Sequence, residues 1–103
     1  MTYRLRARPE VESDILEAAG WYERQQSGLG SDFAREVRRA IRSLKVNPLL
    51  YRIRHTEYRV RWMLLDRFPY RVVFVVERKV ITLLAVTHAK RHDRHWRDRA
   101  QTK

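Results

Sequence analysis

The feature that most constrains the fold is a pair of apolar runs in the second half of the chain. Val72–Val76 is entirely apolar and Val80–Val86 nearly so, and only the charged segment Glu77–Lys79 separates them. Runs of β-branched residues of this length are typical of strands, and the charged break between them predicts a hairpin. Because neither run alternates between polar and apolar side chains, both faces of the hairpin are expected to be buried.

The first half of the chain is expected to form one strand and two helices. Residues 3–8 alternate between Arg and apolar side chains, which predicts a half-buried strand. Apolar residues then recur at helical spacing over Pro9–Gln26 and again after Ser31, which can cap the second helix. Asn47 and Pro48 end the second helix. Its apolar face comprises Phe33, Val37, Ala40, Ile41 and Leu44, of which we expect Phe33, Val37, Ile41 and Leu44 to be buried.

Three more strands are expected near residues 58–65, 71–77 and 80–88, and a short helical tail near residues 93–100. The order is therefore β-α-α-β-β-β. This order predicts an α+β fold in which the helical hairpin packs on one face of a small antiparallel sheet. The 103 residues suit a single domain over residues 1–103 and are too few for two.

Composition excludes several classes of protein. The chain has no cysteine, which rules out disulfides, thiol nucleophiles and thiolate zinc sites and favours a cytoplasmic location. The three glycines, Gly20, Gly28 and Gly30, cannot form a dinucleotide fingerprint or a phosphate-binding loop, so we expect no cofactor. The N-terminus lacks the pattern of a secretory signal, and the longest apolar run is far below the roughly 20 residues of a membrane helix. We therefore expect no membrane partner.

The charge of the chain is high and unevenly distributed. Lys and Arg number 23 against 12 Asp and Glu, for a formal net charge of +11. Residues 1–36 contain five Arg and seven acidic residues, whereas residues 37–103 contain 18 basic and five acidic residues. Such a balance favours a polyanionic partner, which the second part of the chain would contact.

Polar residues gather at the ends of the predicted strands, where the open face of the sheet could display them. Metal-independent RNA cleavage needs a base, a cation that holds the charge on the phosphate, and an acid. Glu57, Arg71 and His88 are of these types. An Arg at the start of a strand is more often a solvated anchor, so both interpretations stay open. The further residues expected to contact nucleic acid or another target are Arg59, Arg61, Lys90, Arg91 and Trp96.

Three histidines, His88, His92 and His95, have a spacing that suggests a metal site. A structural zinc ion takes four ligands, and the surrounding stretch is strongly cationic, so we expect no metal. Solvated or phosphate-facing histidines are the better interpretation. Trp96 lies in the same stretch and could either stack on a base or belong to the core or an interface.

The outer face of the second predicted helix is basic. If apolar patches remain between the helices and the edge of the sheet, this face suits an acidic amphipathic helix from a protein partner. The same residues would also make an ordinary solvated face. The residues expected to bind the partner are Arg35, Arg38, Arg39 and Arg42.

Short motifs follow one another along nearly the whole chain. They are Asp14-Ile15, Trp21-Tyr22-Glu23, Gly28-Leu29-Gly30, Asn47-Pro48 with Tyr51, Phe68-Pro69-Tyr70-Arg71-Val72-Val73-Phe74, and Ala85-Val86-Thr87-His88 followed by Arg91 and Trp96. Each motif is weak alone, but together and in this order they resemble the RelE/ParE toxin superfamily. These proteins are the toxin halves of bacterial type II toxin–antitoxin modules.

The resemblance implies a toxin that arrests bacterial growth and is neutralised by a cognate acidic antitoxin. RelE-like members cleave mRNA on the ribosome, whereas ParE-like members poison DNA gyrase. Arg71 matches the Arg that opens the penultimate strand in the nucleases, His88 lies where some of them place a catalytic His, and Glu57 is a looser match.

The signatures favour the gyrase mechanism. The tyrosine that many nucleases carry near the C-terminus is absent after His88, and the Trp-Tyr-Glu and Gly-Leu-Gly motifs are more similar to ParE. We therefore expect a ParE-like gyrase inhibitor. The alternatives are a RelE-like, metal-independent mRNA endonuclease and a non-toxic module that binds nucleic acid through its phosphates.

Overall fold

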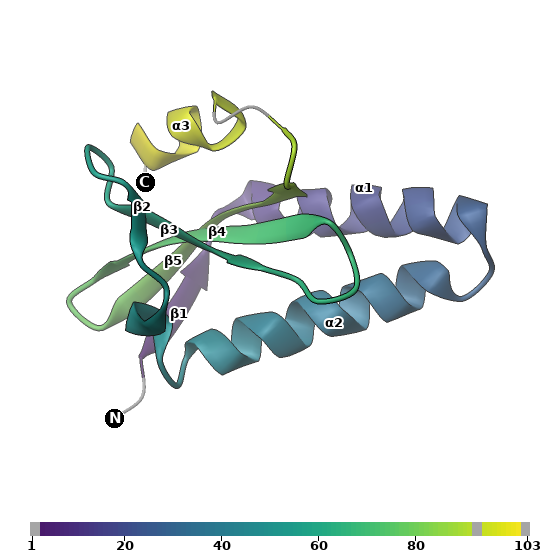
Figure 1. Cartoon of the computed structure of the whole chain (residues 1–103), viewed down its shortest axis with the longest axis horizontal. Helices are drawn as coiled ribbons and strands as arrows, with labels where there is room; N and C mark the ends of the chain where they lie inside the picture. The colour runs from purple at the N-terminus through teal and green to yellow at the C-terminus, as the bar shows by residue number, and fades with distance from the viewer. Residues whose placement is uncertain (1–2, 92–93, 102–103) are drawn as a thin grey trace.

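A central sheet of five strands has helices on both faces (Figure 1). The structure is a computed structural model that describes residues 3–91 and 94–101. The elements in chain order are β1 (Arg4–Ala7), α1 (Pro9–Gln25), α2 (Leu29–Leu44), the 3-10 helix η1 (Pro48–Leu50), β2 (Ile53–His55), β3 (Val60–Leu64), β4 (Tyr70–Glu77), β5 (Val80–His88) and α3 (Arg94–Gln101). The expected α+β fold and its β-α-α-β-β-β order are confirmed, with η1 and the short β2 as additions.

The sheet is mixed rather than antiparallel. Its strand order is β1-β5-β4-β3-β2, and β1 runs parallel to β5 while the other neighbours are antiparallel. The prediction of a purely antiparallel sheet is therefore wrong, because β1 joins β5 at one edge instead of β2 at the other. All four residues of β1 are exposed, so the predicted half-burial of this strand is also wrong. An edge strand lies where the covering layers end.

The turn between α1 and α2 is closed by Glu23. Its carboxylate accepts the backbone N–H groups of Gly28, at 2.9 Å, and of Gly30, at 3.0 Å. Gly28 is the N-cap of α2 and has φ +90°, a left-handed conformation that glycine adopts without strain. The prediction that Ser31 caps α2 is corrected, because the helix starts two residues earlier and Glu23 supplies the acceptor.

The helical hairpin packs on the sheet through the expected apolar face of α2. Phe33, Val37 and Leu44 are fully buried there, and Ile41 is half-buried against the same core. The sheet contributes Val72, Phe74, Ile81, Leu83 and Val86 to this core.

The second face of the sheet is covered by α3. Trp96 has no exposed surface and, with Ala100, packs on Val73, Val75 and Leu84. The sequence predicts a partly open face there, with Trp96 in contact with a target. Both expectations are corrected, since the indole fills the space between α3 and the sheet and belongs to the core.

Candidate functional site

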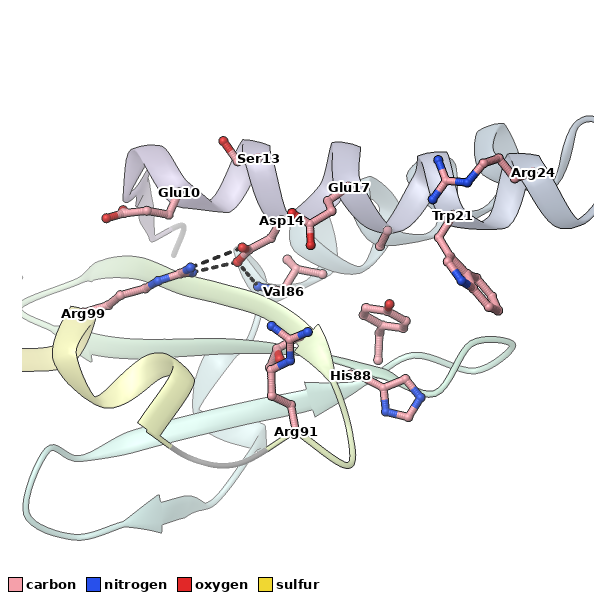
Figure 2. A pocket seen from close by; sticks show the side chains of 13 residues that line it. Glu10, Ser13, Asp14, Glu17, Trp21, Arg24, Val86, His88, Arg91 and Arg99 are labelled. Carbon is pink, nitrogen blue, oxygen red and sulfur yellow. Dashed lines mark hydrogen bonds and ion pairs between the residues drawn. The ribbon is translucent and has the colours of Figure 1, made fainter.

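A groove of about 550 Å³ lies between α1, the end of β5 and α3. Figure 2 shows acidic side chains of α1 on one wall and cationic side chains from β5, the segment after it and α3 on the other. We call it the α1 groove. Its charged residues are Glu10, Asp14, Glu17, Arg24, His88, Arg91 and Arg99.

The inner end of the α1 groove is closed by Asp14. Strand β1 pairs with β5 only as far as Leu83, so beyond that point the outer edge of β5 has no neighbouring strand among the described residues. The Asp14 carboxylate accepts the backbone N–H of Val86 at 3.0 Å and two hydrogen bonds from Arg99, at 2.7 and 3.2 Å (Figure 2). An edge group that would otherwise be unpaired is thereby satisfied.

Arg99 also closes an irregularity in β5. Val73 pairs with Ala85 and Phe74 with Leu83, so Leu84 is the extra residue of a β-bulge. The Leu84 carbonyl accepts a hydrogen bond from Arg99 at 2.9 Å. Asp14 and Arg99 are largely buried and satisfy each other, so they are structural groups rather than ligand-binding groups. Their pairing was missed from the sequence because 85 residues separate them.

The outer end of the α1 groove is aromatic and cationic. The rings of Tyr70 and His88 lie 5.3 Å apart, and Trp21 on α1 is half-exposed. Burial raises the pKa of the Tyr70 hydroxyl; the positive charge of Arg91 lowers it and the negative charge of Glu17 raises it. This end can hold a polar or negatively charged group against rings and cations.

Arg71 lies on the opposite face of the sheet from His88. Its guanidinium stacks 4.3 Å from the centroid of the Trp62 ring and donates a hydrogen bond of 3.1 Å to the carbonyl of Arg91. Only 7% of Arg71 is exposed. Tyr70, its neighbour on β4, faces α1 and pairs with His88, and successive residues of a strand point to opposite faces.

Glu57 is remote from both. It is exposed in the turn between β2 and β3, whereas Arg71 pairs with Leu64 at the other end of β3. The three residues expected to form a catalytic site are therefore not brought together by the structure.

The expected target-binding residues also separate. Arg59 is exposed just before β3, and Lys90 and Arg91 are exposed after β5, at the other end of the sheet. Arg61 is half-buried and donates a hydrogen bond to the carbonyl of Tyr51, which holds η1 and the segment after it against β3.

The basic residues on α2 share one exposed face, as expected from their spacing. Arg35 pairs with Asp32 at 3.1 Å and Arg38 with Glu12 at 3.5 Å. Arg39 and Arg42 are exposed and have no ion-pair partner among residues 3–91 and 94–101. Their role in binding a partner stays a prediction.

Metal ligands do not gather within the described part of the chain. No group of three His, Asp or Glu residues there could hold a metal ion. His92 lies outside the described residues, and the side chain of His95 is not described. No described helix is both long and apolar enough to cross a membrane.

The chain resembles known proteins in sequence pattern and in fold. The family model described as ParE toxin of type II toxin–antitoxin system, parDE, matches residues 5–93. A solved structure titled as a chromosomal ParDE toxin–antitoxin system from P. aeruginosa superposes with a TM-score of 0.75 and 17% sequence identity. The match covers 84% of this chain and 96% of that chain, and at this identity it concerns the fold. No curated protein matches the sequence.

Proposed function

The chain belongs to the ParE toxin family and is the toxin component of a type II toxin–antitoxin system, and from this premise we propose that it arrests bacterial growth by inhibiting DNA gyrase. A cognate antitoxin would neutralise it. Its place of action would be the cytoplasm, where gyrase and the chromosome lie.

The arrangement of Arg71 and His88 is the observation that carries the choice of gyrase over RNA. A nuclease needs its cation and its proton-transfer groups within hydrogen-bond reach of one phosphate. Arg71 stacks on Trp62 beneath the C-terminal segment, His88 faces α1 across the sheet, and Glu57 is at the far end of β3. Inhibition by binding needs no such convergence, so this geometry supports a toxin that binds its target without cleaving RNA.

The experiment measures both activities with the purified protein. Supercoiling by DNA gyrase and cleavage of ribosome-bound mRNA are followed in parallel for the wild type, His88→Ala and Glu57→Ala. Both variants change exposed or half-exposed side chains, so they should fold. We expect the wild type to block supercoiling, mRNA to stay intact, and the variants to inhibit gyrase about as well as the wild type.

Cleavage of mRNA by the wild type, with a loss of at least ~10²-fold in either variant, would overturn the proposal in favour of a nuclease. Binding of nucleic acid without either activity would identify a non-toxic module.

The proposed antitoxin contact is electrostatic. With a net charge of +11 and four Arg on the exposed face of α2, the toxin should attract an acidic protein at long range. The association rate should therefore fall as salt rises, whereas the dissociation rate should change less. An association rate that does not depend on salt would contradict steering by this surface.

A further inference from the structure

One edge of the sheet is left open beside α2. Strand β2 pairs with β3 only through Ile53 with Arg61 and His55 with Val60. The backbone N–H of Leu65 bonds to the Tyr70 carbonyl of the neighbouring chain segment. Main-chain groups alternate in direction along a strand, so those of Leu64 face away from β4, toward a side that no described strand occupies.

The side chains at this edge are not those of a protected edge. Natural sheet edges usually carry charges, proline or a bulge that prevent another strand from pairing. Leu64 is instead 57% exposed. The Arg61–Tyr51 hydrogen bond holds the segment after η1 against β3, so the exposed Leu49 and Leu50 belong to a segment that borders the same edge.

A second groove, of about 320 Å³, runs between this edge and α2. We call it the β3 groove. Its floor is apolar and includes Ala40, Met63 and the buried Leu65. Glu36 fixes its far end, because its carboxylate accepts the backbone N–H groups of Asp66, at 2.8 Å, and Arg67, at 3.0 Å. Figure 1 shows the loop after β3 held near α2 in this way.

The rim of the β3 groove carries positive charge. Arg39 lines it from α2 and has no ion-pair partner within the described residues, and Arg67 lines it from the loop. Glu36 is engaged by two backbone groups and is not available to a partner. An occupant should therefore offer an apolar side chain to the floor and carboxylates to the rim.

We propose that the open edge of β3 and the β3 groove form the docking site of an extended, acidic segment of the antitoxin. The segment pairs with the main chain of Leu64 as an added strand. One of its faces places an apolar side chain on Ala40 and Met63, its other face covers Leu64, and its carboxylates meet Arg39. This inference rests on the proposed function, since it names where the partner of that toxin binds.

The test uses the whole chain and, as probe, the acidic antitoxin encoded beside it. Leu64→Pro removes only the N–H group that faces the open side, so the β3–β4 pairing survives. Leu64→Ala is the matched control, which loses the side chain but keeps the N–H. We expect Leu64→Pro to weaken antitoxin binding by at least about tenfold and by more than Leu64→Ala, because an edge contact depends on main-chain bonds. Arg39→Glu should also weaken binding.

Hydrogen exchange of the wild-type complex gives a second measurement that does not depend on any variant folding. The amide of Leu64 should exchange more slowly with antitoxin bound than in the free toxin. Protection confined to the α1 groove, with Leu64 unchanged, would overturn the proposal. Protection of Leu64 that grows with toxin concentration alone would assign the edge to a second copy of the chain and would overturn it as well.

The gyrase assay separates this inference from the proposed function. If the antitoxin binds at Leu64 but the toxin leaves gyrase unaffected, the docking site stands and the gyrase proposal fails. If gyrase is inhibited but the antitoxin protects another surface, only the docking site fails.

Discussion

Asp14 and Arg99 lie 85 residues apart in sequence and join the first helix to the last through hydrogen bonds of 2.7 and 3.2 Å. The same two side chains satisfy the N–H of Val86 and the carbonyl of Leu84, so α1, β5 and α3 meet at one ion pair. Both side chains are largely buried, at 15% exposed for Arg99 and 11% for Asp14.

Removal of one partner of this pair should destabilise the protein strongly. Asp14→Ala leaves the Arg99 charge uncompensated and the Val86 N–H unpaired, and we expect a loss of about 2–4 kcal/mol in the free energy of unfolding. Urea denaturation measures it. In the matched control Glu12→Ala, an exposed pair 3.5 Å from Arg38 is lost, which should change the free energy of unfolding by less than about 1 kcal/mol. An equally small effect for Asp14→Ala would contradict the structural role of the pair.

Trp96 and Trp21 should respond differently to truncation. Trp96 is fully buried between α3 and the sheet, so Trp96→Ala should cost about 3–5 kcal/mol and release α3 from the sheet. Trp21 is 50% exposed on α1, and Trp21→Ala should cost less than about 1 kcal/mol. Thermal and urea unfolding followed by circular dichroism compare the two variants. Similar losses in both would mean that Trp96 does not form the core of the second face.

The two helical glycines predict opposite effects of the same substitution. A Cβ atom at Gly30 would lie 2.4 Å from the carbonyl oxygen of Ala19, so Gly30→Ala should force α1 and α2 apart and cost about 1–3 kcal/mol. A Cβ atom at Gly20 would meet only the flexible end of Arg24, at 3.6 Å. Gly20→Ala should therefore stabilise the protein by about 0.5–1 kcal/mol. Melting temperatures of the two variants on either side of the wild type would bear this out, and a stabilised Gly30→Ala would refute it.

Alkaline pH should weaken the aromatic part of the core. Burial raises the pKa of the Tyr22 and Tyr70 hydroxyls above their ordinary value of 10.0, and each ring lies 6.0 Å from the other. A pKa that is higher in the folded state gives stability that is fully present below pH 10.0 and is lost as the pH rises above it. The urea midpoint should therefore fall between about pH 9 and about pH 11, and it should fall less steeply in the double variant Tyr22→Phe, Tyr70→Phe. Equal slopes would exclude these hydroxyls as the cause.

Local patterns in the sequence were sufficient for the helical hairpin and the β4–β5 hairpin. The spacing of Phe33, Val37 and Leu44 depends only on the period of a helix, and the apolar runs around Glu77–Lys79 depend only on strand length. The parallel pairing of β1 with β5 depends on contacts distant in sequence, which periodicity does not report. Trp96 and Ala100 are four residues apart, a helical spacing that could have revealed a buried face of α3, but basic neighbours masked it.

The candidate site was harder to predict for a geometric reason. Residues at strand ends share a site only if they also share a face, and the face is set by the register of the sheet. The bulge at Leu84 shifts that register within β5, and Arg71 pairs with Thr87 rather than with His88. No single-strand pattern reveals such a shift.

The partnership of β1 with β5 also decides when during synthesis the protein can become active. Residues 4–7 find their neighbours only in residues 80–83, and the Asp14–Arg99 pair cannot form until α3 has left the ribosome. The helical hairpin is therefore made early but waits with its apolar face uncovered while the sheet is translated. A message broken before the last codons would yield a chain without its closing helix, so only a completed reading of the gene delivers a finished toxin.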